Sequence, residues 1–359
     1  MNEGAKLSAV LVHQGAPGGI GQVERLMDGA FLALGWRLIT LTRRHRIRPT
    51  LPRMASIAKA RFALRVIRTV AKQQPNIVLL THLNFAPLAL PIRIASPRSR
   101  IVSMAHGTEA WSPLPVWTQL ALKAIDAVWC NSASTRAMLI RESATPSKKL
   151  RVLLLGLPQE RAKSIESQAT DVPSGRSPKF RLLSVSRLDR TERWKGIEHV
   201  LLSLAYVRLI DPRFDYRVIG AGDDLSALQG LARSIGVSDM VEFTGTNYGD
   251  DAVANALHEC DAVVLPAARE GFCIAHVEAM CAGKPLIAAR SGATPQVVGD
   301  KSGVLTTYGD AAGIAQAILH LMSSSTFASA LGRSARARYD ALFTEAAFQA
   351  RVRQLLEAL

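Results

Sequence analysis

Residues 269–290 read Arg269-Glu-Gly-Phe-Cys-Ile-Ala-His-Val-Glu278-Ala-Met-Cys-Ala-Gly-Lys-Pro-Leu-Ile-Ala-Ala-Arg290, and this stretch decides the fold more than any other. It follows an apolar strand pattern at Asp261–Leu265 and predicts a turn and then a helix, with Glu278 eight positions after Glu270. Both carboxylates can then face the crevice at the carboxyl ends of parallel strands, where open α/β folds bind ligands. The free N–H groups of the helix's first turn suit a phosphate. An ordinary βα unit with two solvated glutamates gives the same pattern, so the rest of the chain has to decide.

Short apolar runs alternate with helical patterns along the chain, which is typical of βα units on parallel sheets. Six strands are predicted in the first half, at Ser8–His13, Trp36–Leu41, Ile77–Thr81, Arg100–Met104, Ala127–Cys130 and Leu150–Leu155. Six more are predicted in the second half, at Phe180–Ser186, Tyr216–Gly220, Met240–Thr244, Ala262–Leu265, Pro285–Ala289 and Gly303–Thr306. The pattern predicts an α/β fold with two Rossmann-like domains facing each other across a cleft.

A segment between the two strand sets predicts the domain boundary. Residues 156–178 are rich in Pro, Gly, Ser and charge and lack apolar periodicity, so we expect a linker there. A chain of 359 residues is long enough for two domains. We therefore predict an N-terminal domain at 1–165, a second domain at 179–340 and a C-terminal helical segment at 341–359, helical from Glu345.

The composition indicates a soluble intracellular protein. No run of about 18 uncharged apolar residues occurs. The nearest approach, Asn76–Ala95, is interrupted by polar residues and prolines, and the N-terminus lacks the pattern of a signal peptide. The four cysteines show no Cys-x-x-Cys spacing, which favours a reduced cytoplasmic setting over disulfides or structural zinc.

The positive charge is concentrated in the first half of the chain. Of the net charge of +15, residues 1–170 carry 24 Lys and Arg against 8 Asp and Glu, while the remainder carries 20 against 21. No acidic residue occurs between Asp28 and Glu109. Within that span, a basic stripe follows helical spacing and consists of Arg61, Arg65, Arg68 and Lys72.

Three interpretations of this stripe remain open. A basic amphipathic helix docks on anionic lipid, and we rank this interpretation first. A solvated basic face ranks second. Nucleic-acid binding ranks last, because aromatic residues make up 6% of the chain and, apart from Phe62, none lies among these basic residues. We expect a peripheral protein on the cytoplasmic membrane face and no nucleic-acid partner.

Two cations follow the first strand of the second half. Arg187 ends that strand, and Lys195 stands eight positions later at the start of a predicted helix. Two cations near a helix N-terminus can neutralise a diphosphate, a task otherwise given to a metal. A solvated basic loop explains these residues equally well when they are taken alone. No Asp-x-Asp occurs in the chain, so we expect no metal and no cofactor.

The first half offers a glycine-rich turn and a histidine. Gly18 and Gly19 follow the first strand, which permits close backbone approach to a ligand. The Gly-x-Gly-x-x-Gly fingerprint is absent and no acid ends the second strand, which argues against a dehydrogenase. His106 follows the fourth strand, on the expected ligand side, with structural and functional roles about equally supported.

Read in order, these motifs resemble the retaining glycosyltransferases called glycosyl transferases group 1 (family 4), which have two Rossmann-like domains in the GT-B arrangement. The resemblance covers nearly the whole chain. It is most specific in the words SRL (186–188), WKGIEHVLLSLA (194–205), RVIGAGDD (217–224), VEFTGT (241–246), CDAVVLPAAREGFCIAHVEAMCAGKPLIAARSGATPQVV (260–298) and SGVL (302–305).

The resemblance implies roles for the second-half residues toward a nucleotide-sugar donor. Arg187 and Lys195 would hold the diphosphate, Glu278 the ribose hydroxyls, and Glu270 a hydroxyl of the donor sugar. The backbone N–H groups of residues 272–274, which are Phe272, Cys273 and Ile274, would lie near the sugar and the phosphate.

In the first half, the resemblance implies that Gly18 and Gly19 would approach the diphosphate and that His106 would sit beside the transferred sugar. It also implies a metal-independent hexosyl transfer with retention of anomeric configuration, without a clear enzymic nucleophile. The acceptor would be a lipid-linked or envelope glycan, as in lipopolysaccharide or exopolysaccharide biosynthesis. A GT-B-fold sugar-nucleotide epimerase or phosphorylase, and a non-catalytic nucleic-acid-binding relative, are the alternatives.

The chain departs from the family pattern at three places. Cys273 stands where the family commonly has glycine, which bears on the sugar subsite. Ala267-Ala268-Arg269 replaces the usual small-residue turn, and Gly156-Leu157-Pro158 replaces the word that usually closes the first domain. None of these changes removes a charged group that the implied chemistry requires.

Overall fold

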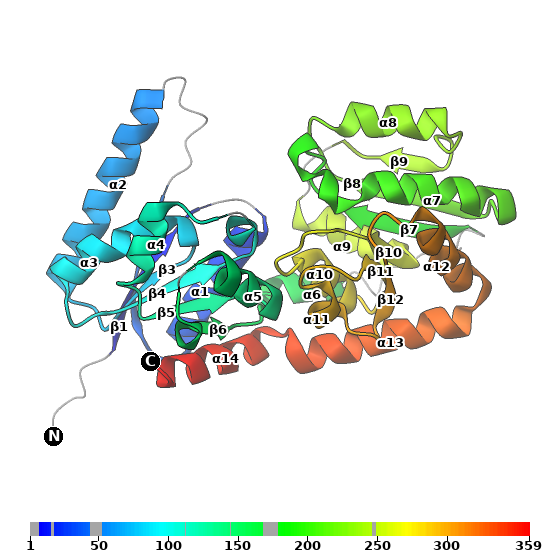
Figure 1. The fold of residues 1–359 in the computed structure, drawn as a ribbon. Coiled ribbons are helices and arrows are strands. Elements are labelled where there is room, and N and C mark those ends of the chain that lie inside the picture. The colour runs from blue at the N-terminus through cyan, green and yellow to red at the C-terminus, as the bar shows by residue number, and fades with distance from the viewer. Residues whose placement is uncertain are drawn as a thin grey trace. The chain divides into compact units, whose positions relative to one another are not determined.

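The protein is described from a computed structural model that covers residues 7–15, 18–43, 52–111, 113–143, 145–167, 179–245 and 249–359. The chain forms two compact units (Figure 1). Unit 1 comprises Met1–Gly156 together with Glu345–Leu359, and unit 2 comprises Leu157–Thr344. Each unit is built on its own parallel sheet.

Unit 1 contains a six-stranded parallel sheet in the order β2-β1-β3-β4-β5-β6. Its strands are β1 (Ser8–His13), β2 (Arg37–Thr42), β3 (Ile77–Leu80), β4 (Arg100–Ala105), β5 (Ala127–Cys130) and β6 (Leu150–Val152). Its α-helices are α1 (Gly19–Ala33), α2 (Pro52–Gln73), α3 (Ala89–Ala95), α4 (Val116–Leu122), α5 (Ala133–Glu142) and α14 (Glu345–Glu357). Short 3-10 turns are η1 (Leu83–Leu88), η2 (Thr108–Ala110) and η3 (Ser147–Lys149).

Unit 2 repeats this architecture with the strand order β12-β11-β10-β7-β8-β9. Its strands are β7 (Phe180–Val185), β8 (Phe214–Ile219), β9 (Val241–Phe243), β10 (Ala262–Leu265), β11 (Leu286–Ala289) and β12 (Gly303–Thr306). Its helices are α6 (Gln159–Ser167), η5 (Arg190–Lys195), α7 (Ile197–Ile210), α8 (Leu225–Ser234), α9 (Asp250–Glu259), α10 (Ile274–Cys281), α11 (Thr294–Val298), α12 (Ala311–Ser323) and α13 (Ser325–Leu342). The pair α7 and α12 packs side by side (Figure 1).

The central strands are apolar because helices cover both of their faces. Every residue of β3, β5, β10 and β11 is buried, which gives continuous apolar runs rather than alternation. Side-chain caps fix the starts of α5 and α12: Ser132 accepts a hydrogen bond from the Thr135 N–H at 3.1 Å, and Asp310 accepts one from the Gly313 N–H at 2.8 Å. Continuous burial of the strands, with capping at some helices, therefore supports the βα units.

All twelve predicted strands are confirmed. Four of them, β1, β5, β10 and β12, have the predicted bounds. The others are shifted by one to three residues at an end; β6, for example, stops at Val152 rather than Leu155. The two parallel sheets confirm the α/β two-domain prediction.

The predicted linker is wrong over part of its length. Residues Gln159–Ser167 form helix α6, which buries Ala162 and Ile165, and unit 2 begins at Leu157. The sequence pattern does not predict this helix, because only two apolar side chains lie on its buried face and the third buried residue is Arg161. Residues 168–178 of the predicted linker lie outside the described residues.

The end of the chain also differs from the predicted segment at 341–359. Helix α13 ends at Leu342 in unit 2, whereas α14 belongs to unit 1. Phe348 and Val352 on α14 are fully buried, and α14 packs against α1. Arg351 adds a hydrogen bond at 3.1 Å to the carbonyl oxygen of Leu154.

Within the described ranges, no single helix has the length and apolar character needed to cross a membrane, although α12 together with 325–357 passes that test as a sharply bent pair.

Candidate functional site

The candidate site of unit 2 lies where its strand order reverses. After β7, the chain adds β8 and β9 on one side and then returns to place β10 on the other side. Ligands bind at the carboxyl ends of the strands that flank such a switch point. Arg187 follows β7 and Glu270 follows β10, so the topology brings together the two loops that the sequence singled out.

The loop after β7 is held by its own side chains. Asp189 accepts hydrogen bonds from the N–H of Thr191 at 2.9 Å and from its hydroxyl at 2.7 Å, which starts η5. Gly196 ends η5 with φ of 80°, and a Cβ at this position would lie 2.6 Å from the carbonyl oxygen of Pro266. Glycine is therefore required at residue 196, where the β7 and β10 loops meet.

Both predicted cations are paired with carboxylates. Lys195 Nζ lies 2.5 Å from Glu270 Oε1, and the Arg187 guanidinium donates to Glu192. Burial works against the charge on Lys195, but attraction and hydrogen bonding from Glu270, with Glu192 also near, outweigh it and raise the pKa of Lys195. Sequence reasoning missed Glu192, which resembles an ordinary solvated acid within a basic loop.

The loop before α10 is rigidly packed. The carbonyl oxygen of Glu270 accepts a hydrogen bond from the Ala293 N–H at 2.9 Å, and a Cβ on Gly292 would lie 2.6 Å from the same oxygen. Phe272 is buried, which anchors the loop to the core. Cys273 precedes α10 with φ of 66°, in the left-handed region that favours glycine. These contacts orient the N-terminus of α10, which begins at Ile274.

Glu278 does not stand open in the crevice as the sequence suggested. It is 7% exposed, and its Oε1 lies 2.7 Å from Nε of Arg161 on α6. Sequence reasoning missed Arg161, because it stands in the stretch predicted to be a linker. The carboxylate predicted for ribose is therefore held in a buried ion pair.

A buried histidine lies next to this machinery. His276 on α10 is fully buried, and its Nε2 lies 3.3 Å from the carbonyl oxygen of Leu265, while Nδ1 has no hydrogen-bond partner. Burial lowers the pKa of His276 to about 4, with Lys195 adding to the effect and Glu270 opposing it. The ring is therefore neutral near pH 7.

Unit 1 has its own switch point between β1 and β3, and the glycine turn lies there. Gly18 caps α1 with φ of 75°, and α1 begins at Gly19. Buried Glu24 accepts hydrogen bonds from the N–H groups of Gln14 at 2.5 Å and Gly15 at 3.2 Å. Glu24, which was not predicted, therefore anchors the chain that enters the turn.

His106 is connected to the same turn through Thr81. The His106 Nε2 lies 2.7 Å from the Thr81 carbonyl oxygen, so Nε2 carries the proton, and the Thr81 hydroxyl donates to Glu24 at 3.1 Å. The His82 ring lies 5.5 Å from the His106 ring, and burial lowers the pKa of His82. His106 and the glycine turn thus occupy the carboxyl edge of one sheet, as predicted.

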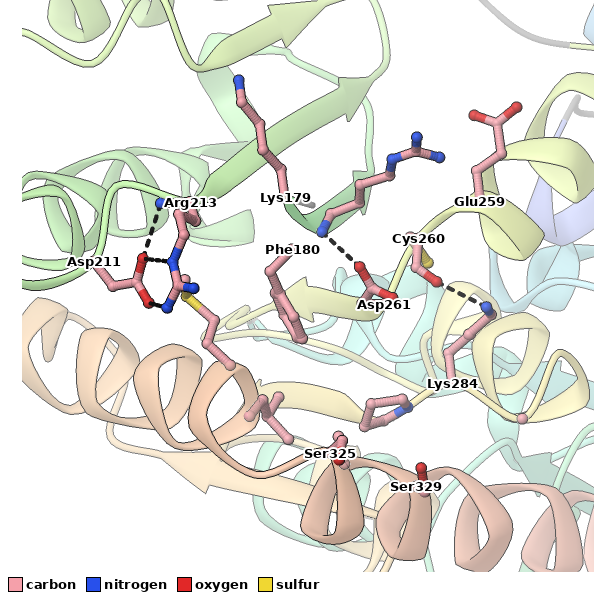
Figure 2. Close-up of a pocket in the computed structure, with 16 residues that line it drawn as sticks. Lys179, Phe180, Asp211, Arg213, Glu259, Cys260, Asp261, Lys284, Ser325 and Ser329 are labelled. Atoms are coloured by element: carbon pink, nitrogen blue, oxygen red, sulfur yellow. Dashed lines mark hydrogen bonds and ion pairs between the residues drawn. The ribbon is translucent and has the colours of Figure 1, made fainter. Parts of the chain in front are cut away.

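A separate pocket of about 410 Å³ lies at the opposite edge of the unit 2 sheet (Figure 2). Its lining includes Phe180 at the start of β7 and Asp261 just before β10, which places it at the amino ends of the strands. Arg213 pairs with Asp211 at 2.6 Å, and Lys284 donates to two backbone carbonyl groups. Because ligands of open α/β folds bind at the carboxyl ends of the strands, this pocket at the amino ends does not replace the site beside Lys195 as a diphosphate site.

In the part of the chain that the structure describes, no group of three or more His, Cys, Asp or Glu side chains is arranged to hold a metal ion.

Two family profiles match the chain in succession. Residues 169–338 match the family described as glycosyl transferases group 1, and residues 17–161 match glycosyltransferase family 4. The two matched ranges correspond closely to units 2 and 1.

Two curated relatives share less than 30% sequence identity with the chain. A GDP-mannose-dependent alpha-(1-6)-phosphatidylinositol monomannoside mannosyltransferase from Mycolicibacterium smegmatis is 29% identical over 269 residues, which cover 70% of this chain and 69% of that protein. An MMP alpha-(1->4)-mannosyltransferase from Mycolicibacterium hassiacum is 28% identical over 152 residues, 42% of this chain and 36% of that protein.

Solved structures share the fold over nearly the whole chain. Anabaena Alr3699/HepE in complex with UDP and glucose gives a TM-score of 0.74 at 19% identity and covers 99% of this chain and 100% of that one. Sucrose-phosphate synthase from Thermosynechococcus elongatus gives 0.78 at 20% identity, with 98% and 99% covered. The chain therefore belongs to the glycosyl transferases group 1 family and is a glycosyltransferase of the GT-B fold.

Proposed function

We propose that the protein transfers a hexose from a nucleotide-sugar donor with retention of anomeric configuration and without a metal. One observation carries the proposal: Lys195 and Arg187 lie at the switch point of unit 2, each held by a carboxylate. The negative charge of a diphosphate is large enough for it to replace the two carboxylates as the partner of both cations. When the sugar leaves, these cations stabilise the negative charge that develops on the departing diphosphate.

The neighbouring groups then take complementary roles. Glu270, released as Lys195 turns to the diphosphate, accepts a hydrogen bond from a hydroxyl of the donor sugar. Glu278 accepts hydrogen bonds from the ribose hydroxyls. The N-terminal N–H groups of α10, from Cys273 and Ile274, face the phosphate end of the donor, where the helix dipole favours negative charge. We also propose that Gly18 and Gly19 contribute to binding the diphosphate and that His106 contributes to binding the transferred sugar.

We propose an envelope glycan or a lipid-linked glycan as the acceptor. Two relatives support this class: the Mycolicibacterium smegmatis protein is named for a phosphatidylinositol monomannoside, and an Erwinia amylovora relative, 26% identical over 221 residues, is named for amylovoran biosynthesis. The mannosyltransferase names make GDP-mannose a reasonable first donor to test, and the UDP complexes of the Anabaena structure add UDP-sugars.

We further propose that unit 1 docks on the anionic cytoplasmic face of a membrane. Arg61, Arg65, Arg68 and Lys72 on α2 are all exposed. Helix α3 packs against both α2 and α4, and α3 and α4 add exposed apolar side chains: Ile94 is 82% exposed, Trp117 74% and Val116 67%. Exposed apolar groups beside cations suit a surface that offers both hydrocarbon and negative charge.

A donor panel tests the catalytic proposal. Thermal unfolding is measured with UDP- and GDP-linked hexoses, because a bound donor stabilises the fold by mass action. The donor that binds is then supplied with a membrane glycolipid extract in the presence of EDTA, and the anomeric configuration of the product is read by NMR. An inverted product rejects retention, and loss of transfer in EDTA that added metal restores rejects metal independence.

Vesicle sedimentation tests the membrane proposal. Binding should require anionic lipid and weaken in high salt. Replacing Arg61, Arg65 and Arg68 by Gln should reduce it by roughly 100-fold, at about 1 kcal/mol for each lost charge. Equal binding to vesicles of zwitterionic lipid would contradict electrostatic docking.

A further inference from the structure

A buried ion pair joins α6 to α10 within unit 2. Arg161 Nε lies 2.7 Å from Glu278 Oε1, and the two side chains are 4% and 9% exposed. Burying both charges carries a desolvation cost that two apolar side chains of similar volume would avoid. A buried pair is thus weak evidence for a purely stabilising role, and the position of this one calls for a functional explanation.

Helix α6 has other attachments to unit 2. Ala162 and Ile165 bury apolar surface, and Glu166 pairs with Arg336 at 2.7 Å. These contacts come from the same helix, within five residues of Arg161. The helix therefore remains anchored without the charge of Arg161, which separates the role of that charge from the role of the helix.

We propose that Arg161 is a positioning residue for donor binding: its guanidinium holds the Glu278 carboxylate in the orientation in which it accepts hydrogen bonds from the ribose hydroxyls. This inference rests on the proposed function, which gives Glu278 the ribose. It adds a residue outside the motif that carries Glu270 and Glu278.

The chemistry of the two groups supports this division of labour. An ionised carboxylate is purely an acceptor and offers about four lone-pair sites, so it can serve Arg161 and two ribose hydroxyls at once. Arginine has a planar, charged group that donates hydrogen bonds in fixed directions, so its pairing at 2.7 Å fixes the orientation of the carboxylate.

Calorimetric titration with UDP, GDP and ADP tests the proposal on the full chain. Arg161→Met should weaken binding of the nucleotide that wild type binds by about 10- to 100-fold, the range for losing hydrogen bonds to a charged group. Arg161→Lys keeps the charge and should recover part of the affinity.

Matched variants separate positioning from stability. Glu166→Gln removes an ion pair of the same helix that does not touch Glu278, and it should bind nucleotide like wild type. Adding Glu278→Gln to Arg161→Met should cost little further affinity, because the first change already disables the carboxylate. Thermal unfolding monitors each variant, and Arg161→Lys carries the comparison if Arg161→Met does not fold.

The outcomes are distinct. If wild type binds none of the three nucleotides, the proposed donor chemistry and this role for Arg161 are both rejected. If Glu278→Gln weakens binding while Arg161→Met and Arg161→Lys bind like wild type, the donor site stands and the positioning role is overturned. Equal losses of affinity in Arg161→Met and Glu166→Gln would likewise assign the pair to stability alone.

Discussion

Replacing Lys195 by Met tests the diphosphate site directly. The Lys195 side chain is 24% exposed and its Nζ lies 2.5 Å from Glu270, whereas the side chain of Arg187 is 72% exposed. Solvent and salt screen an exposed charge more strongly than a partly buried one. We therefore expect Lys195 to contribute more than Arg187 to holding the β-phosphate of the donor.

The magnitude follows from what the lysine gains and gives up. A hydrogen bond between charged groups contributes about 1.5–3 kcal/mol. In the free enzyme Lys195 already pairs with Glu270, so the net gain on binding lies near the lower end, about 10-fold in affinity. Because Glu270 also loses its partner, unfolding should become easier by about 1–3 kcal/mol. For a unit of this size each kcal/mol lowers the melting temperature by about 2–4 °C.

Comparing diphosphates with monophosphates isolates the effect. Calorimetry with UDP against UMP, and GDP against GMP, should show that Lys195→Met weakens binding of the diphosphate by about 10-fold and leaves binding of the monophosphate nearly unchanged. Lys179→Met is the control, because Lys179 is 45% exposed and pairs with Asp215 near the amino ends of the strands. Equal losses for both phosphates, or no loss for the diphosphate, would refute the assignment.

Three further outcomes are expected. Cys273→Gly should melt about 2–4 °C above Cys273→Ala in a thermal scan, because at φ of 66° a Cβ costs about 1 kcal/mol; equal melting temperatures would remove the strain argument. Wild type should lose up to about 3 kcal/mol of stability as the pH falls from about 6.5 toward 4, because His276 is protonated in the unfolded state before it is protonated in the folded state. In denaturant titrations, His276→Gln should flatten this dependence of stability on pH. An unchanged dependence would exclude His276 as its cause. Glu192→Gln should tighten UDP or GDP binding by up to about 5-fold, because it frees Arg187, whose side chain is 72% exposed, from a pair worth about 0–1 kcal/mol. Weaker binding would show that Glu192 orients the arginine instead.

The sheets could be predicted because their signals are local. Runs such as Ala262–Leu265 are uninterrupted apolar stretches bounded by turn residues, and parallel strands buried on both faces require that pattern. Once the strands are placed, the rule that ligands bind at carboxyl strand ends puts Arg187 and Glu270 beside one another without any knowledge of side-chain positions.

The remaining parts depend on contacts between residues far apart in the chain. Arg161 and Glu278 are 117 positions apart, and nothing in the sequence around either residue indicates that the two form a pair. Glu24 resembles a surface acid of an amphipathic helix until its contacts with Gly15 and Thr81 are known. Helix α6 was hidden because an inward-facing arginine breaks the apolar period that identifies buried helix faces.

The return of residues 345–359 to unit 1 affects the order in which the protein matures. Domains generally fold as units while the ribosome synthesises the chain. The core of unit 1, however, is incomplete until Phe348 and Val352 are present, and these residues are translated only after all of unit 2. During synthesis, the surface of α1 that α14 will cover stays uncovered until the last part of this sequence emerges. The half of the enzyme that is translated first is therefore the half that completes its packing last.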